Sequence, residues 1–170
     1  NELELVWIQM IAENRITAFV YSPRATLETD DAGNVVVGLS YTDELYFFGD
    51  SAGGDGGKAI QVLKLGPTGS LIWSRQVMGE ALGSCGVAIN ELGEIFLTGR
   101  GGGDVFLTKY NAGGDLIWRR VAGGLGPSDL GDNVKLDAAS NVYVTGLLSP
   151  SNNVYFDSLS VSLPLTTYLA

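Results

Sequence analysis

Short apolar segments alternate with turns along most of the chain, and the clearest set lies between residues 86 and 121. Four segments there, 86–90, 94–99, 104–110 and 115–121, are rich in β-branched and other apolar residues. Turns that contain glycine separate most of them, as expected for strands joined by tight hairpins. The pattern predicts a four-stranded antiparallel meander, in which each strand pairs with the next.

The same order of segments occurs twice more. Strands are predicted over 26–30, 34–38, 59–65 and 70–77 before this meander, and over 134–137 and 141–146 after it. The sequence PTGSLIWSR at 67–75 returns as AGGDLIWRR at 112–120, and ELVW at 4–7 is a looser third copy. Such self-similarity predicts a repeat architecture. We expect one all-β domain over 1–170, with repeats at about 1–66, 67–111 and 112–170.

The turn between the first two strands of each repeat follows one pattern. It reads DDAGN at 30–34, NELGE at 90–94 and DAASN at 137–141. An Asp or Asn in the first position of a turn accepts hydrogen bonds from the backbone just after it, and Gly or Ser tolerates the crowded turn position. These carboxylates are therefore interpreted as turn residues and not as a catalytic pair.

Composition narrows the function classes. The chain has 170 residues, of which 24 are glycine and 45% are hydrophobic, as is typical of a turn-rich globular protein. No run approaches the roughly 18 consecutive apolar residues of a membrane helix, so no membrane insertion is expected. A net charge of −9, from 19 acidic and 10 basic residues, repels phosphate backbones, so nucleic acid is not an expected partner.

Two residue types limit the chemistry. The sequence contains no histidine, which excludes a Ser-His-Asp triad, a Cys-His pair and a histidine-bearing zinc site within this chain. The single cysteine, Cys85, forbids an internal disulfide and is interpreted as a small packing residue. We therefore predict that the protein is not an enzyme and has no catalytic residues and no resident cofactor, with calcium as the one candidate ion.

Three segments carry a resemblance to a known family. NVYVTG at 141–146, DVFLTKYN at 104–111 and GDLIW at 114–118 resemble the bacterial β-propeller repeats of the SBBP type and, more distantly, NHL-type blades. The likeness covers nearly the whole chain, although its motifs are short and structural. It implies four-stranded propeller blades with the strand near Gly86 innermost and the tryptophan strand outermost. Trp7, Trp73 and Trp118 would then pack between blades, and the setting would be extracellular or at the cell surface.

The resemblance also places both ends of the chain in one blade. Residues 168–170 align with 106–108 in the third strand of a blade, while residues 4–10 match a lone outer strand. Because propellers have about four to eight blades, three blades predict part of a larger or oligomeric propeller. Three arrangements stay open: a piece of a longer propeller, a homo-oligomer that exchanges residues 4–10 between chains, and an open stack of sheets.

The longest connecting segments are predicted to share one edge of the sheets. In a meander, alternate connections fall on opposite edges of the sheet. One edge is therefore predicted to carry the tight turns, at 31–33, 66–69, 92–93, 111–114 and 138–140. The opposite edge is predicted to carry the long segments, at 12–25, 41–57, 122–131 and 147–165. Insertions on one side of a repeat protein often mark its binding face. The alternation DSLSVS at 157–162 also predicts an added hairpin or edge strand there. The candidate binding residues in these segments are Tyr46, Phe47, Phe48, Asp129, Asp132, Asn152, Asn153 and Tyr155.

A stretch rich in glycine and aspartate, GDSAGGDGG at 49–57, carries the candidate metal ligands Asp50 and Asp55. Their carboxylates and the backbone carbonyls nearby are groups that bind calcium, although the stretch lacks the ordered ligand spacing of an EF-hand. The alternative is a solvated loop without a metal.

Three functions remain open at this point. The first is a non-catalytic surface module that binds a protein or glycan through the edge of long segments, as in adhesion. The second is a structural role in a lattice, a fibre or a virion-like particle. The third is the propeller part of an enzyme whose catalytic residues lie outside this chain.

Overall fold

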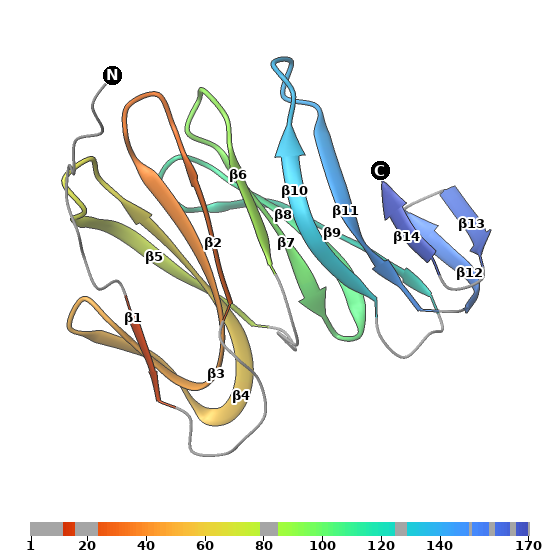
Figure 1. Cartoon of the computed structure of the whole chain (residues 1–170), viewed down its shortest axis with the longest axis horizontal. Coiled ribbons are helices and arrows are strands. Elements are labelled where there is room, and N and C mark those ends of the chain that lie inside the picture. Colours follow the sequence, from red (N-terminus) through yellow and green to blue (C-terminus); the bar gives the residue numbers. More distant parts are fainter. Residues whose placement is uncertain are drawn as a thin grey trace, which may run out of the picture.

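The described part of the chain folds into antiparallel β-sheets. A computed structural model describes residues 12–15, 24–78, 85–124, 129–149, 151–156, 159–163 and 166–169. Within these residues there are strands and turns but no helix, and the strands form three sheets (Figure 1). The prediction of an all-β fold is therefore confirmed. The same described residues contain no helix that is long and apolar enough to span a bilayer.

The first two sheets are the meanders that the apolar pattern predicts. The first contains β2 (Arg24–Thr29), β3 (Val35–Phe47), β4 (Asp50–Leu65) and β5 (Leu71–Met78), and each strand is antiparallel to the next. An additional strand, β1 (Ala12–Arg15), pairs with the far end of β3. The second sheet has the same order, with β6 (Gly86–Ile89), β7 (Ile95–Gly101), β8 (Asp104–Tyr110) and β9 (Leu116–Gly124).

The third sheet follows the same plan. Its described strands are β10 (Leu130–Leu136), β11 (Val142–Leu148) and β14 (Thr166–Leu169). Tyr168 pairs with Gly146 as Phe106 pairs with Gly99 in the second sheet. β14 therefore holds the third-strand position that the alignment of 168–170 with 106–108 predicts. The expected outer strand at 4–10, including Trp7, lies outside the described residues.

The insertion between β11 and β14 is a β-hairpin. Its strands are β12 (Ser151–Phe156) and β13 (Leu159–Leu163). β12 also pairs with the end of β9, with Tyr155 opposite Gly123, so the hairpin extends the second sheet. The added hairpin that the alternation at 157–162 predicts is thus present.

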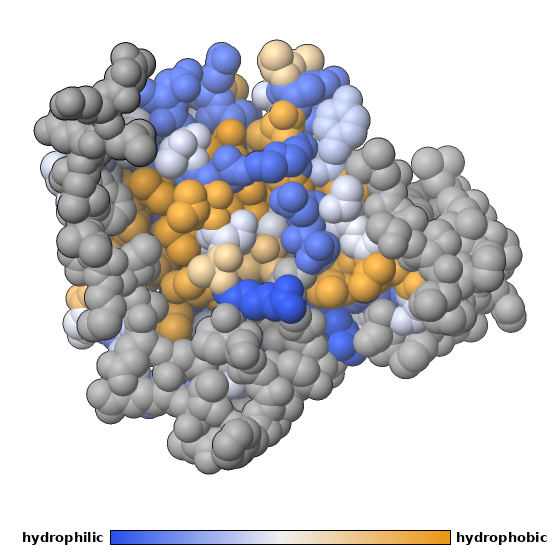
Figure 2. All heavy atoms as spheres, viewed as in Figure 1, coloured by the Kyte–Doolittle hydropathy of each residue, from blue (hydrophilic) through white to orange (hydrophobic). Residues whose placement is uncertain are grey.

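The three sheets pack face to face, and their first strands β2, β6 and β10 lie next to one another in the centre of Figure 1. Because successive side chains of a strand point to opposite faces, the second sheet contributes to two separate clusters. Figure 2 shows apolar residues lying between hydrophilic ones on the face seen in Figure 1. The first cluster joins Val36, Val62 and Trp73 to Val87, Leu97 and Phe106, and the second joins Ala88 and Phe96 to Val134 and Val144.

Close backbone contact is required where the second and third sheets meet. A Cβ atom on Gly86 would lie 2.6 Å from Asn133 Cα and 2.7 Å from Val134 N. Backbone atoms cannot move aside for such a Cβ without separating the strands, so β6 and β10 approach this closely only with glycine at position 86.

The two described tryptophans pack between neighbouring sheets, as predicted. Trp73 is buried, and its Nε1–H donates a hydrogen bond of 3.0 Å to the carbonyl oxygen of Ala112 in the β8–β9 turn. Trp118 lies edge-on to Phe96, with ring centroids 6.2 Å apart, in the cluster shared with the third sheet. The repeated tryptophan therefore has the same packing role in both sheets.

The segment 41–57, predicted as a long connecting segment, forms the arms of a hairpin, so the solvated-loop alternative for 49–57 is wrong. β3 and β4 are joined by the two-residue turn Phe48-Gly49, whose φ values of 49° and 84° are those of a type I′ turn. Tyr41, Leu45 and Phe47 continue the buried row that Val37 begins on the same face. Because these side chains are covered, extended strands are favoured over a loop despite the many glycines at 49–57.

Candidate functional site

The sheets have one edge with tight turns and one edge with added structure. In Figure 1 the turns after β2, β6 and β10 point to the top, whereas β1 and the tip of the β3–β4 hairpin lie at the lower left. β9 and β11 each begin at a tight turn, so their other ends lie away from the tight turns. The β12–β13 hairpin follows the end of β11 and pairs with the end of β9. We call this side the elaborated edge. Its elements extend from strand ends away from the tight turns, but they lie in two places, with β1 and the β3–β4 tip at the lower left of Figure 1 and the β12–β13 hairpin at the right.

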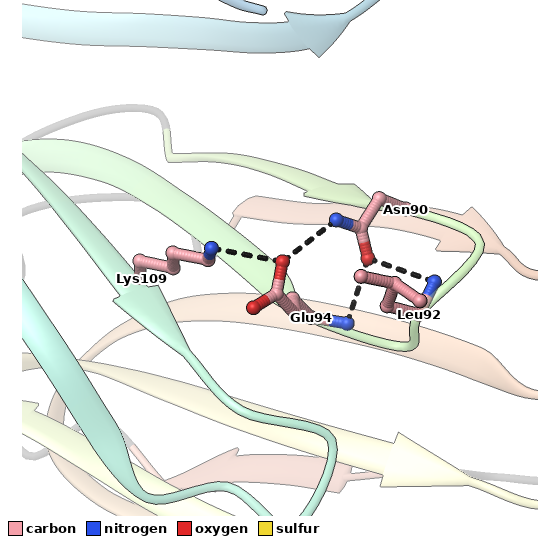
Figure 3. Close-up of polar contacts among 4 residues, drawn as sticks. All are labelled: Asn90, Leu92, Glu94 and Lys109. Atoms are coloured by element: carbon pink, nitrogen blue, oxygen red, sulfur yellow. Dashed lines mark hydrogen bonds and ion pairs between the residues drawn. The ribbon is translucent and has the colours of Figure 1, made fainter. Parts of the chain in front are cut away.

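One five-residue turn recurs on the tight-turn edge, and Figure 3 shows it at 90–94. Asn90 Oδ1 accepts hydrogen bonds from the N–H groups of Leu92 and Glu94, at 3.1 and 2.9 Å. Asn90 Nδ2 donates to Glu94 Oε2 at 2.8 Å, and Lys109 Nζ lies 2.8 Å from the same oxygen. The fourth residue, Gly93, has φ 73°. The predicted role of the first residue as a turn acceptor is confirmed.

The fifth residue of this turn also has a role, which the sequence analysis missed. In four of the described turns the side chains of the first and fifth residues are bonded to each other, one an amide and the other a carboxylate, so a donor meets an acceptor; the turn at 66–70 has the same backbone bonds but begins with Gly66 and ends with Ser70. The amide and acid four residues apart were the available signal. The other pairs are Asp30 with Asn34, Asn111 with Asp115, and Asp137 with Asn141.

The carboxylates of Glu94 and Asp137 are held in their charged form. The hydrogen bond from Asn141 is the main cause that lowers the pKa of Asp137 below its ordinary value. The hydrogen bond from Lys109, followed by that from Asn90, lowers the pKa of Glu94 in the same way. A general acid needs a proton near neutral pH, so these shifts fit a structural role.

The tip of the β3–β4 hairpin carries one group of the candidate residues. Tyr46 donates a hydrogen bond of 2.5 Å to Glu44 Oε2, and Phe48 is half-buried in the turn. Phe47 is buried, which leaves little of its ring accessible. Asp50 is exposed, and its Oδ1 accepts a hydrogen bond of 2.8 Å from the N–H of Ser51.

Asp55, the second candidate metal ligand, belongs to β4, but its side chain lies outside the described set. Among the side chains that are described, no group of three or more His, Cys, Asp or Glu residues is placed to hold a metal ion. Calcium binding at Asp50 and Asp55 therefore stays a prediction.

Asp129 is only 1% exposed, so its prediction as an exposed binding group is wrong. Its Oδ1 accepts a hydrogen bond of 2.7 Å from the N–H of Ser149, and its Oδ2 accepts one of 3.1 Å from the N–H of Gly124. Its own N–H donates to the carbonyl oxygen of Gly103 at 2.7 Å. The pKa of the nearby Asp104 is raised, mainly because this carboxyl is partly buried and also because the charge of Asp129 is close to it. Asp129 thus joins β9, the end of β11 and the β7–β8 turn, because a buried carboxylate needs such donors.

The remaining candidates surround this junction. Asp132 is exposed on β10, and Tyr155 is exposed on β12, beside the end of β9. Asn152 and Asn153 also belong to β12, with side chains outside the described set. The elaborated edge therefore has two groups of candidates, one at the β3–β4 tip and one around β10 and β12.

A cleft of about 470 Å³ lies on the opposite edge, between the turns at 90–92 and 137–140. Its floor includes Ile89 and Leu136, and Leu92 stands exposed at its side. Asp137 Oδ1 is already bonded to the N–H groups of Ala139 and Asn141. The carboxylate of Asp137 is therefore used by its own turn, and Glu91 is the other acidic residue of the cleft lining.

Comparison with known proteins finds no match, neither to a family model nor to a curated protein. The resemblance to propeller repeats therefore stays a prediction, and the functional proposals depend on the geometry of the described residues.

Proposed function

We propose that the chain is a non-catalytic, β-propeller-type segment of an extracellular or cell-surface protein and binds a protein or glycan through its elaborated edge. The observation that carries the proposal is that β1, the long β3–β4 hairpin and the β12–β13 hairpin are all added at strand ends away from the short turns. Repeat proteins commonly bind through the side that carries their insertions. Exposed Tyr155, Asp132 and Asp50 supply aromatic and polar groups suited to such contacts.

The packing of the sheets supports the propeller type. Two four-stranded meanders and a third sheet with the same first three positions pack face to face. Their first strands lie together, and a glycine permits the closest backbone approach. This is the arrangement expected of blades whose inner strands surround an axis.

The β3–β4 hairpin offers a direct test, because the second sheet contains a short version of it. Tyr41 pairs with Ala59 at the position where Gly101 pairs with Asp104. Replacement of residues 42–58 by Gly-Gly would therefore give β3 and β4 the two-residue turn that joins β7 and β8. The full chain would be screened on a glycan array and against extracellular-matrix proteins. We expect the shortened variant to bind a ligand found in this way at least about tenfold more weakly, as measured by calorimetry.

The matched control is Leu92→Ser on the tight-turn edge, where the side chain is 76% exposed. This variant should bind like the parent chain, and circular dichroism should show that both variants are folded. The proposal is contradicted if no ligand is found in the screen, or if Leu92→Ser loses binding while the shortened hairpin retains it.

A structural assembly role is the second candidate, and the position of β14 favours it. One side of β14 pairs with β11, and its other side corresponds to the side of β8 that pairs with β9. A strand from a second chain, for which we propose residues 4–10, would complete the third sheet there. Val6→Pro removes a backbone donor from that strand and should abolish assemblies seen by electron microscopy. Assemblies unchanged by Val6→Pro would argue against strand exchange.

A further inference from the structure

Equivalent positions can be assigned in all three sheets from the pairing register. The first hairpin of each sheet ends with one cross-strand pair, and counting back from that pair aligns the strands. The end pairs are Thr29 with Val35, Ile89 with Ile95, and Leu136 with Val142. Leu27, Val87 and Val134 are therefore equivalent on the first strands, as are Val36, Phe96 and Tyr143 on the second strands.

Burial on the first strands depends on whether a sheet precedes them. Val87 and Val134 are 1% and 0% exposed, because each packs towards the preceding sheet. Leu27 occupies the same position in the first sheet and is 61% exposed. Leu27 is therefore exposed at a position whose equivalents in the other two sheets are buried.

The second strands show the complementary pattern. Val36 and Phe96 are 0% and 2% exposed because each is covered by the following sheet. Tyr143 is 43% exposed, and Leu147, on the same face of β11, is 52% exposed. The hydroxyl of Tyr143 donates to Asp137 Oδ2 at 3.1 Å, so the polar end of the ring is satisfied while its apolar surface remains accessible.

We infer that these two outer faces bind each other between copies of the chain, with the β2 face of one copy against the β11 face of a second. The two interfaces between sheets inside the chain show what would cover each outer face. In the contact between copies, Leu27 would take the position that Val87 and Val134 have inside the chain, and Tyr143 of the second copy would take the position of Val36 and Phe96. The contact centres on the first strands because Val37 and Leu63, farther along the same face of the first sheet, are already buried. Such a head-to-tail contact forms a ring or an open chain of copies.

An engineered disulfide tests this contact. Within the chain, a Cβ on Gly38 would lie 3.0 Å from Val87 Cγ1. Gly38 corresponds to Thr145 and Val87 to Leu27, so the equivalent contact between copies joins Thr145 to Leu27. We would prepare two chains that carry Cys85→Ala, one with Leu27→Cys and the other with Thr145→Cys, mix them, and oxidise them.

The expected product is a mixed disulfide dimer that exceeds the dimer formed by either chain alone. Gly38→Cys with Val87→Cys in one Cys85→Ala chain is the internal control, and it should form an intrachain disulfide because the same geometry is already present. Absence of the mixed dimer while this control is oxidised would overturn the inference.

Light scattering over a range of concentrations provides the second measurement. Leu27→Glu and Tyr143→Glu should each weaken self-association at least about tenfold, because a carboxylate would be buried in the contact. Leu92→Glu adds the same charge at an exposed turn residue outside both faces and should change nothing. A parent chain that stays monomeric, or an oligomer abolished by Val6→Pro but retained in Leu27→Glu, would overturn face-to-face docking. Neither result bears on ligand binding at the elaborated edge.

Discussion

Replacement of Trp73 by Phe and by Ala separates the polar and apolar contributions of the tryptophan between the first two sheets. The indole is buried and donates a hydrogen bond of 3.0 Å to Ala112 O. Its ring also lies against Gly114, where a Cβ would be 2.9 Å from Trp73 Cδ2. Trp73→Phe removes the hydrogen bond and part of the ring, whereas Trp73→Ala removes nearly all of the contact.

The magnitudes follow from these contacts. Ala112 O also accepts from Lys64 Nζ at 3.5 Å, so it keeps a partner in Trp73→Phe, and the loss should be about 0.5–1.5 kcal/mol with a small further loss of packing. Trp73→Ala leaves a cavity between the sheets and should lower the free energy of unfolding by about 3–5 kcal/mol. Because domains are commonly stable by about 5–15 kcal/mol, this is a large fraction of the total.

The assay is urea unfolding followed by far-ultraviolet circular dichroism, with Trp118→Phe and Trp118→Ala as matched controls. Trp118 is half-buried, so its replacement by Ala should cost less than that of Trp73. The reasoning is refuted if Trp73→Phe costs as much as Trp73→Ala, or if Trp118→Ala is the more destabilising of the two alanine variants.

Three further predictions concern single residues. Gly86→Ala places a Cβ against the backbone at Asn133 and should lower the free energy of unfolding by about 1–3 kcal/mol or more, as measured by urea unfolding. Lys109 lowers the pKa of Glu94 from its usual 4.5. The ionised Glu94 therefore stabilises the folded state above that value, and this stabilisation is lost as pH falls through the lower folded pKa. Glu94→Gln should lose less stability than the parent between about pH 5 and 3, as measured by urea unfolding at each pH. Burial raises the pKa of Cys85 to about 12, so iodoacetamide should modify it only after unfolding; rapid modification of the folded chain would contradict this.

Local features of the fold were readable from the sequence because each depends on neighbouring residues. The turns at 30–34, 90–94 and 137–141 are set by an Asp or Asn in the first position and by a residue that tolerates positive φ in the fourth, Gly33, Gly93 or Ser140. Strand alternation and the repeated tryptophan likewise predicted the meanders and the contacts between them. The elaborated edge followed from segment lengths in a meander.

Features that depend on what covers a residue were not readable in this way. The composition of 49–57 indicates a loop, yet the arms of the β3–β4 hairpin are extended because Leu45 and Phe47 find a buried face. Asp129 has the sequence surroundings of a solvated loop, but the N–H groups of Gly124, at the end of β9, and Ser149, just after β11, hold it in the interior. Neither outcome is encoded within a few residues of the position concerned.

The sequence by itself determined the repeat, the order and direction of the strands, the tight turns, and the absence of histidine chemistry from this chain. Only the tertiary structure decided which apolar residues are exposed, as the contrast between Leu27 and its buried equivalents Val87 and Val134 shows. The physical reason is that hydrogen bonds within a turn or between adjacent strands depend on local spacing, whereas burial depends on whether another sheet lies against the residue.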